Sequence, residues 1–385
     1  MLKGFQFTST AGLNFRVGGV QDLGKEVKSM DAHKVLLVTD PGVTKSNLIE
    51  KPIESLKKEG IPFTVFAEVE PNPSVETVEK GYKLLEEQKC DCIVALGGGS
   101  SIDAGKAIGI LDSNPAPILQ YEGANKVKNP PLPLVAIPTT AGTGSEVTGA
   151  SVITDKSRKY KTSIRSPFLI PKIALLDPEL LCTLPLPVLA ATGMDAFTHA
   201  YEAFVSTVTN PVSQGLAYDS MRLIGKNLRR FYANPDNLEA AGYMLLASTM
   251  AGMAFFNGRV GIIHAMAHPL GGFFDIPHGV ANAILLPHCM EFSLIAVPEL
   301  FARISQALGI NTKGMSEEEA GKESIRVVRK MMADINIPKG LKEVGAKKDA
   351  FEAMAKDAVS SGIHLTTPRK TTFEDMVRLY QAAYE

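Results

Sequence analysis

The chain has 385 residues and a formal net charge of −1, from 40 lysines and arginines against 41 aspartates and glutamates. A single hydrophobic core usually stops growing at about 250 residues, so this length indicates two domains. The balanced charge produces no field that would attract a phosphate backbone or an anionic membrane, and we expect neither nucleic acid nor membrane as a partner.

Up to about residue 185, short β-branched runs alternate with amphipathic stretches. Strands are predicted at 34–40, 63–69, 91–99 and 133–140, and helices at 47–60 and 75–88. The alternation is typical of βαβ units and predicts a Rossmann-like α/β domain, with a parallel sheet covered by helices on both faces.

Beyond residue 185 the sequence has helical periodicity and few strand-like runs, which predicts an all-α domain. We place the boundary in the proline-rich stretch 184–187. The expected domains are therefore a dinucleotide-binding α/β domain over residues 1–185 and an all-helical domain over residues 186–385.

The stretch CIVALGGGSSIDAGKAIGIL (92–111) indicates a buried strand, a glycine turn and a helix whose Ser100 and Asp103 match a capping box. Glycines let the backbone approach a ligand closely, and a helix amino terminus offers free N–H groups and a partial positive charge. The pattern predicts a phosphate site. The alternative is a tight turn that binds nothing.

A second loop, IPTTAGTGSEVT (137–148), also follows a predicted strand, and Asp40 ends an earlier one. Loops at the carboxyl ends of parallel strands flank the usual ligand crevice of open α/β sheets. There Asp40 could accept hydrogen bonds from an adenosine ribose and disfavour NADP, although it precedes the glycines, whereas the common fingerprint has its acid about 20 residues after them. Asp40 could equally form a turn before Pro41.

Four of the seven histidines lie in the apolar, glycine-rich segment 261–288. Asp195 and His199 are four residues apart and would share one face of a helix, and His264 and His268 repeat this spacing. The candidate metal ligands are Asp195, His199, His264 and His278. One carboxylate and three imidazoles suit Fe²⁺, Zn²⁺ or another divalent transition metal, and contain too much nitrogen for Mg²⁺ or Ca²⁺. The alternative is a set of hydrogen-bonded core histidines.

Four motifs together resemble the iron-dependent (group III) alcohol dehydrogenase family, which includes lactaldehyde reductases and 1,3-propanediol dehydrogenases. They are GGGSSIDAGKAIG, IPTTAGTGSEVT, LPVLAATGMDAFTHAYEAFVS and HAMAHPLGGFFDIPHGVANAILLPH. The resemblance covers essentially the whole chain and implies a dehydroquinate synthase-like architecture. It also implies an NAD(H)-dependent alcohol dehydrogenase or aldehyde reductase for small primary alcohols, assembled as a homodimer or a larger homo-oligomer.

The resemblance assigns the metal to the same four residues and places His268 near the nicotinamide, where it could relay a proton or order the pocket. The implied cofactor contacts are Asp40, Asn72, Gly97, Gly98, Gly99, Ser100, Ser101, Thr139, Thr140, Thr143, Val152 and Lys161.

Arg259 stands five residues before His264, where related proteins usually carry a small residue. A guanidinium can hold an anionic group bidentately, so Arg259 could bind an anionic tail on the substrate. It could equally be an arginine on a helix surface.

Two other classes of function fit parts of the pattern. A metal-dependent lyase of the dehydroquinate synthase type uses NAD transiently but would need a more basic pocket than AMAHPLGGFF provides. A binding protein without turnover would have no need of an intact ligand set.

The first residues lack the apolar stretch of a secretory signal and the four cysteines form no Cys-x-x-Cys pair, so we expect a cytoplasmic protein with free thiols.

Overall fold

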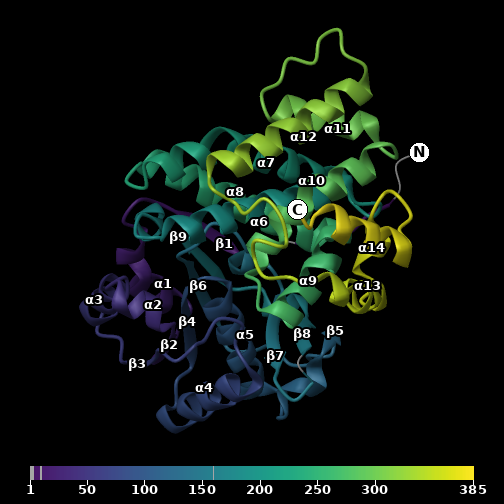
Figure 1. Cartoon of the computed structure of the whole chain (residues 1–385). Helices are drawn as coiled ribbons and strands as arrows, with labels where there is room; N and C mark the ends of the chain where they lie inside the picture. Colours follow the sequence, from purple (N-terminus) through teal and green to yellow (C-terminus); the bar gives the residue numbers. More distant parts are fainter. Residues whose placement is uncertain (1–3, 9–10, 159) are drawn as a thin grey trace. The chain divides into compact units, whose positions relative to one another are not determined.

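The structure is a computed structural model that describes residues 4–8, 11–158 and 160–385 (Figure 1). The chain forms two compact units. One unit spans Thr8–Leu184, and the other spans Pro185–Glu385 together with the amino-terminal segment up to Phe7.

The first unit contains a six-stranded sheet in which all neighbouring strands are parallel. Its spatial order is β1 (Gly12–Phe15), β9 (Ile173–Leu176), β6 (Leu134–Pro138), β4 (Cys92–Gly97), β2 (Val35–Val38) and β3 (Phe63–Phe66). The predicted α/β class with a parallel sheet is confirmed.

Successive residues of the central strands enter two different cores, one on each face of the sheet. Leu36 and Ile93 belong to one core, and their neighbours Leu37 and Val94 belong to the other. The first core is completed by α4 (Val75–Gln88) and α5 (Gly99–Ser113), and the second by α1 (Leu23–Ser29), α2 (Pro41–Lys45) and α3 (Glu50–Lys58). Burial on both faces explains why these strands are continuously apolar in sequence.

A second, three-stranded sheet was not anticipated from the sequence. It has the order β5 (Gly123–Ala124), β8 (Tyr160–Arg165) and β7 (Ala150–Asp155), with β7 and β8 antiparallel. Strand β7 alternates between buried and more exposed residues, so it contains no continuous apolar run that would mark it as a strand. Short 3-10 turns η1 (Gly19–Asp22), η2 (Ile118–Tyr121), η3 (Ser145–Val147), η4 (Pro167–Leu169) and η5 (Pro178–Leu181) complete this unit.

Strands β2, β4 and β6 are neighbours, so their carboxyl ends lie along one edge of the sheet. Asp40 follows β2, the glycine turn follows β4, and the loop 139–148 follows β6. The chain continues from β2 to β3 on one side and from β4 to β6 on the other. This reversal of direction is the topological switch point at which open α/β sheets bind ligands.

The second unit is built from helices, as predicted. They are α6 (Leu186–Val205), α7 (Pro211–Ala233), α8 (Leu238–Gly258), α9 (Ile262–Phe274), α10 (His278–Leu294), α11 (Pro298–Ala307), α12 (Glu317–Asp334), α13 (Phe351–Ser360) and α14 (Phe373–Ala382), with 3-10 turns η6 (Lys348–Ala350) and η7 (Ile363–Thr366). Helix α6 packs against α7, α8 and α10 and is buried along most of its length. Helix α10 also packs against α9, which brings the histidine-bearing helices together.

Among the described residues, α8 is the one helix long and apolar enough to cross a membrane by length and composition. Of its most apolar window, 61% is buried inside the protein. This burial is typical of a core helix.

Candidate metal centre and cofactor site

Helix α6 carries the first two candidate metal ligands, Asp195 and His199. Their spacing of four residues puts them on one face of the helix, and Asp195 Oδ2 lies 3.9 Å from His199 Nδ1. Both side chains are almost fully buried. The imidazole of His199 stacks on Phe255 of α8 with ring centroids 4.3 Å apart, which fixes its plane.

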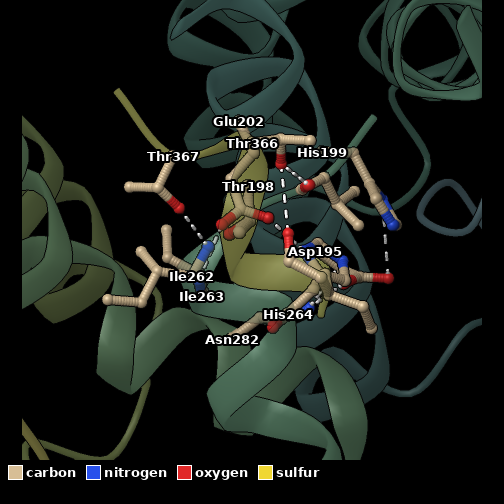
Figure 2. Close-up of polar contacts among 12 residues, drawn as sticks. Asp195, Thr198, His199, Glu202, Ile262, Ile263, His264, Asn282, Thr366 and Thr367 are labelled. Carbon is tan, nitrogen blue, oxygen red and sulfur yellow. Dashed lines mark hydrogen bonds and ion pairs between the residues drawn. The ribbon is translucent and has the colours of Figure 1, made fainter. Parts of the chain in front are cut away.

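Helix α9 brings His264 to the same point (Figure 2). The rings of His199 and His264 stack with centroids 4.5 Å apart. One potential ligand atom from each of Asp195, His199 and His264 lies within 4.8 Å of the other two, and all three residues are buried. The structure thus gathers three of the four predicted ligands from two helices.

His278 and His268 lie at the more exposed edge of this cluster. His278 is the first residue of α10, its side chain is 31% exposed, and its Nε2 lies 3.9 Å from Asp195 Oδ1. Its ring centroid lies 5.3 Å from that of His264 and 5.4 Å from that of the exposed His268. His278 therefore stands beside the buried trio, and His268 stands beside His278.

Asn282 is a member of the cluster that the sequence analysis missed. Its side-chain amide donates to Asp195 Oδ1 at 2.7 Å and lies 3.2 Å from Nε2 of both His264 and His278. Its Oδ1 is buried without a hydrogen-bond partner among the described residues. Asn282 follows His278 by four residues, so helical spacing could have identified it.

Glu202 is a second missed residue. It lies on α6, seven residues after Asp195, and its Oε2 is 2.6 Å from His264 Nδ1. Burial raises the pKa of Glu202 to about 7, although the backbone N–H groups near the start of α9 favour its charged form. An acid in the apolar stretch THAYEAF was the available signal.

Burial also sets the protonation of the candidate ligands. It raises the pKa of Asp195, against the opposing effects of His199 and the Asn282 hydrogen bond. It lowers the pKa of His264 well below the ordinary value, with His199 adding to the shift. A buried carboxylate lies beside a buried imidazole whose pKa is lowered, and the Asn282 amide oxygen has no partner among the described residues. A divalent cation would satisfy such a set of lone pairs. The residues therefore fit a transition metal.

The glycine turn in the other unit has a shape that only glycine permits. Gly97 has φ 147°, and a Cβ there would lie 2.5 Å from Ser101 Oγ and 2.9 Å from Asp40 Oδ2. A Cβ at Gly99 would lie 2.8 Å from the Thr143 side chain. The turn is therefore packed against both Asp40 and the second loop, and a side chain at Gly97 or Gly99 would clash with these neighbours.

The predicted capping box at the start of α5 is wrong. The N-cap is Gly98, and no side chain caps the helix. Asp103 instead accepts hydrogen bonds from Ser145 Oγ at 2.5 Å and from Val152 N at 3.0 Å. Tertiary contacts with the second loop and β7 take the carboxylate away from its own helix.

Asp40 is the N-cap of α2. Its Oδ1 accepts from the backbone N–H groups of Gly42 and Val43, at 2.8 and 3.0 Å, and its Oδ2 accepts from Ser101 Oγ at 2.9 Å. These hydrogen bonds support the alternative interpretation, in which Asp40 shapes the turn before Pro41. Contact with a ribose stays a prediction.

Three of the remaining predicted cofactor residues come from separate segments and meet. Asn72 donates its backbone N–H to Ser100 Oγ at 3.3 Å, and Lys161 Nζ donates to Asn72 Oδ1 at 2.8 Å. Thr139 is buried, with its N–H bonded to the Gly97 carbonyl, whereas Thr140 is half-buried.

Lys106 of α5 is a third residue that the sequence analysis missed. It is buried, and its ammonium donates to the Ser145 carbonyl at 2.6 Å, Ser145 Oγ at 2.9 Å, and the carbonyls of Thr148 and Ala150 at 2.9 and 2.8 Å. Burial lowers the pKa of Lys106 to about 8, against the attraction of Asp103 and Glu146. This one side chain ties α5 to the second loop and to β7.

Arg259 terminates α8 and lies beyond its last turn rather than on the helix surface. Its backbone has φ 68° and ψ 160°, a region that is essentially reserved for glycine. Its N–H donates to the carbonyl of Phe255, the residue whose ring stacks on His199. The side chain is exposed.

Comparison with known proteins gives matches along almost the whole chain. The family model described as iron-containing alcohol dehydrogenase matches residues 11–178, and the model for the C-terminal part of the Fe-containing alcohol dehydrogenase family matches residues 189–384. The chain belongs to the iron-containing alcohol dehydrogenase family.

Among curated relatives, 1,3-propanediol dehydrogenase of Citrobacter freundii is 42% identical over 96% of both chains. The NAD-dependent methanol dehydrogenase of Bacillus methanolicus is 37% identical over 95% of this chain and 96% of its own. A solved 1,3-propanediol oxidoreductase superposes with a TM-score of 0.97 at 40% identity, covering 99% of this chain and 100% of that one. These relatives favour an alcohol dehydrogenase over a lyase of the dehydroquinate synthase type.

Proposed function

We propose that this protein is a metal-dependent NAD(H) alcohol dehydrogenase and aldehyde reductase acting on small primary alcohols and their aldehydes. Membership of the iron-containing alcohol dehydrogenase family gives the reaction class. The observation that carries the proposal is the buried trio Asp195, His199 and His264, whose ligand atoms lie within 4.8 Å of one another.

Asp195, His199, His264 and His278 would hold Fe²⁺, with Zn²⁺ or another divalent transition metal as substitutes that suit the same donors. A cation of this kind, when bound, polarises the carbon–oxygen bond of an alcohol or aldehyde. The buried residues of the chain contribute by excluding water and by disfavouring the charged form of His264, because burial lowers its pKa.

The glycine turn and second loop would hold NAD, which supplies the hydride acceptor or donor. One relative, the methanol dehydrogenase of Bacillus methanolicus, is described as NAD-dependent, which supports this assignment. Gly98 is the N-cap of α5 and no side chain caps the helix, so its first N–H groups could bind a pyrophosphate. Thr140 and Thr143 lie against Gly98 and Gly99 from the second loop. Asp40 would disfavour a 2′-phosphate with its carboxylate.

His268 is the residue of the cluster best placed to move a proton. It is exposed, and its ring centroid lies 5.4 Å from that of His278. We assign it the transfer of the substrate hydroxyl proton towards solvent, a role for which an imidazole suits neutral pH.

We further propose a cytoplasmic homo-oligomer. All four residues of edge strand β1 are exposed, and among the described residues the strand pairs on one side only, with β9. Its apolar side chains Leu13 and Phe15 are 42% and 43% exposed. An uncovered apolar edge of this kind supports association with a second copy.

The test is NADH oxidation with propanal or glycolaldehyde, measured before chelation, after chelation and after return of Fe²⁺ under anaerobic conditions. An alcohol dehydrogenase loses activity on chelation and regains it with iron. A lyase that uses NAD transiently gives no net change in NADH, and a binding protein gives neither turnover nor rescue by metal.

Arg259 supports a narrower proposal, that the substrate carries an anionic tail. Arg259 places an exposed guanidinium on a backbone conformation that favours glycine, and its N–H donates to the carbonyl of Phe255, whose ring stacks on His199. Arg259→Ala should raise KM about tenfold for an anionic aldehyde such as succinic semialdehyde and leave propanal unchanged. Arg222→Ala, which removes an exposed guanidinium on α7, is the matched control. Equal effects on charged and neutral aldehydes would reject the assignment.

A further inference from the structure

The start of α9 is capped by side chains from distant parts of the chain. The residue before the helix is a glycine and offers no side-chain cap. Thr367 Oγ1 instead accepts from the N–H of Ile262 at 3.0 Å, and Glu202 Oε1 accepts from the N–H of Ile263 at 2.6 Å (Figure 2). Two caps supplied from elsewhere therefore fix where the helix begins.

Glu202 also contacts the side chain of His264, the residue after Ile263, whereas Thr367 does not. Its second oxygen, Oε2, lies 2.6 Å from Nδ1 of His264. The Asn282 side-chain nitrogen can only donate, and it lies 3.2 Å from Nε2 of His264. Nε2 therefore keeps its lone pair, Nδ1 carries the hydrogen, and Glu202 Oε2 accepts it. That Nε2 faces the metal cluster.

Glu202 belongs to the same helix as two of the proposed ligands. Asp195, His199 and Glu202 follow at intervals of four and three residues, so all three lie on one face of α6. Helix α6 thus supplies two ligands directly and holds the third, His264, through Glu202.

A charge at this position is more than a helix cap requires. Thr367 shows that a neutral hydroxyl suffices to cap α9, and burying a carboxylate costs several kcal/mol before its partners compensate. Glu202 is 3% exposed and uses both oxygens on two consecutive residues. The second contact, with the imidazole, is what distinguishes it.

We propose that Glu202 is a positioning residue of the metal centre, which fixes the tautomer and ring orientation of His264 by bracketing residues 263–264 at the start of α9. The inference rests on the proposed metal site. Carboxylates that orient metal-binding histidines in this way typically change metal affinity by about 10- to 100-fold when they are replaced.

The experiment compares Glu202→Gln with Thr367→Val. A glutamine has one acceptor oxygen where two are needed, so either the Ile263 N–H or the imidazole loses its partner. Thr367→Val removes a cap from the same helix without touching His264. Co²⁺ affinity is measured by absorbance in competition with a chelator, and thermal unfolding is followed in parallel.

Both variants should unfold at lower temperature, but only Glu202→Gln should raise the Kd for Co²⁺, by about 10- to 100-fold, and alter the Co²⁺ absorption spectrum. Glu202→Asp, which keeps the charge, should recover part of the affinity. Equal Co²⁺ affinity in Glu202→Gln and wild type would overturn the inference and leave the metal centre standing. A wild-type chain that binds no Co²⁺ would overturn the proposed function itself.

If Glu202→Gln does not fold, the unmutated protein provides the test. Nitrogen-15 spectra of histidine-labelled protein, stripped of metal, distinguish imidazoles protonated at Nδ1 from those protonated at Nε2. A hydrogen on Nδ1 of His264 is expected, and one on Nε2 would refute the proposal.

Discussion

The two candidate sites of this protein are built in opposite ways. In the helical unit, Asp195, His199 and His264 are buried side chains on helices α6 and α9, and other buried side chains hold them in place. In the α/β unit, most of the predicted cofactor residues lie in turns that follow strands or in the first turn of α5, while Val152 and Lys161 lie on β7 and β8. One site depends on the positions of a few side-chain atoms and the other on the shape of the backbone.

The chemistry of the two ligands explains the difference. A transition metal needs three or four donor atoms at fixed distances, so its ligands belong on rigid elements that exclude water. A pyrophosphate is recognised by N–H groups at a helix start, so the essential requirement is that no Cβ stands in the way. At Gly97 and Gly99 a Cβ would clash with Ser101, Asp40 and Thr143, so the close packing of this turn depends on glycine.

The largest effect is expected when a proposed ligand of the metal centre is removed. Asp195→Ala should abolish turnover and weaken metal binding by more than about 100-fold, because the single carboxylate of the set is lost. Metal content is measured by elemental analysis alongside activity. Asp219→Ala, at a half-exposed aspartate on α7, should leave both intact. A normal metal content in Asp195→Ala would reject the ligand assignment.

Lys106 offers the corresponding test on the cofactor side. Lys106→Met keeps the length of the side chain but leaves the carbonyls of Ser145, Thr148 and Ala150 without their donor. We expect a loss of roughly 3 kcal/mol in the free energy of unfolding and weaker NAD binding, since the second loop is released.

The control for Lys106 is Lys83→Met, at an exposed lysine of α4, which should change the free energy of unfolding by less than about 0.5 kcal/mol. Denaturant unfolding and NADH fluorescence titration measure the two effects. Wild-type stability in Lys106→Met would show that the loop is held by other contacts.

Asp40→Gly separates a structural role from a cofactor role. The change removes the cap of α2 and the bond from Ser101, with an expected cost of about 1 kcal/mol. If the carboxylate also repels a 2′-phosphate, kcat/KM with NADPH should rise relative to NADH. Asn237→Gly removes a cap from α8 and should not change coenzyme preference. An unaltered preference in Asp40→Gly would mean that Asp40 serves the turn alone.

The smallest expected effect concerns the turn that carries Asn72. Partial burial of Glu70 raises its pKa, but the hydrogen bonds from Thr77 and Ser74 outweigh it and lower the pKa to about 2. Its unfolded value is 4.5, so the carboxylate stabilises the folded state above that pH, and the contribution is lost as the pH falls towards 2.

Glu70→Gln should therefore cost about 1 kcal/mol at pH 7, a figure reduced for the partial exposure of the side chain. Thermal unfolding of the variant and wild type at pH 7, 5, 4 and 3 measures the difference, which should narrow as the pH decreases. A constant difference over this range would contradict the linkage.

Much of the architecture could be predicted because it follows from local patterns. The apolar runs of β2, β4 and β6 and the helical periodicity after residue 185 gave the parallel sheet and the helical unit. Strands β7 and β8 were missed because half of their residues face away from the core. The capping box failed because Ser145 and Val152, more than 40 residues away, bind the carboxylate of Asp103.

The candidate ligands could be proposed from spacing, whereas the contacts that support them are mostly long-range. Asp195, His199 and His264 stand in short motifs, and the structure brings them together; their roles remain predictions. Asn282 lies four residues after His278, at helical spacing, but it also contacts Asp195 and His264, 87 and 18 positions away. Glu202 contacts His264, 62 positions away, and Lys106 contacts Ala150, 44 positions away.

The sequence by itself determined the alternation of strands and helices, the glycine turn and the choice of nitrogen and oxygen donors, because these depend on residue type and short-range periodicity. Only the tertiary structure decided which buried polar groups form hydrogen bonds with one another. That choice depends on the three-dimensional packing of α6, α9 and α10, since a buried charge or amide must find its partner wherever the fold places one.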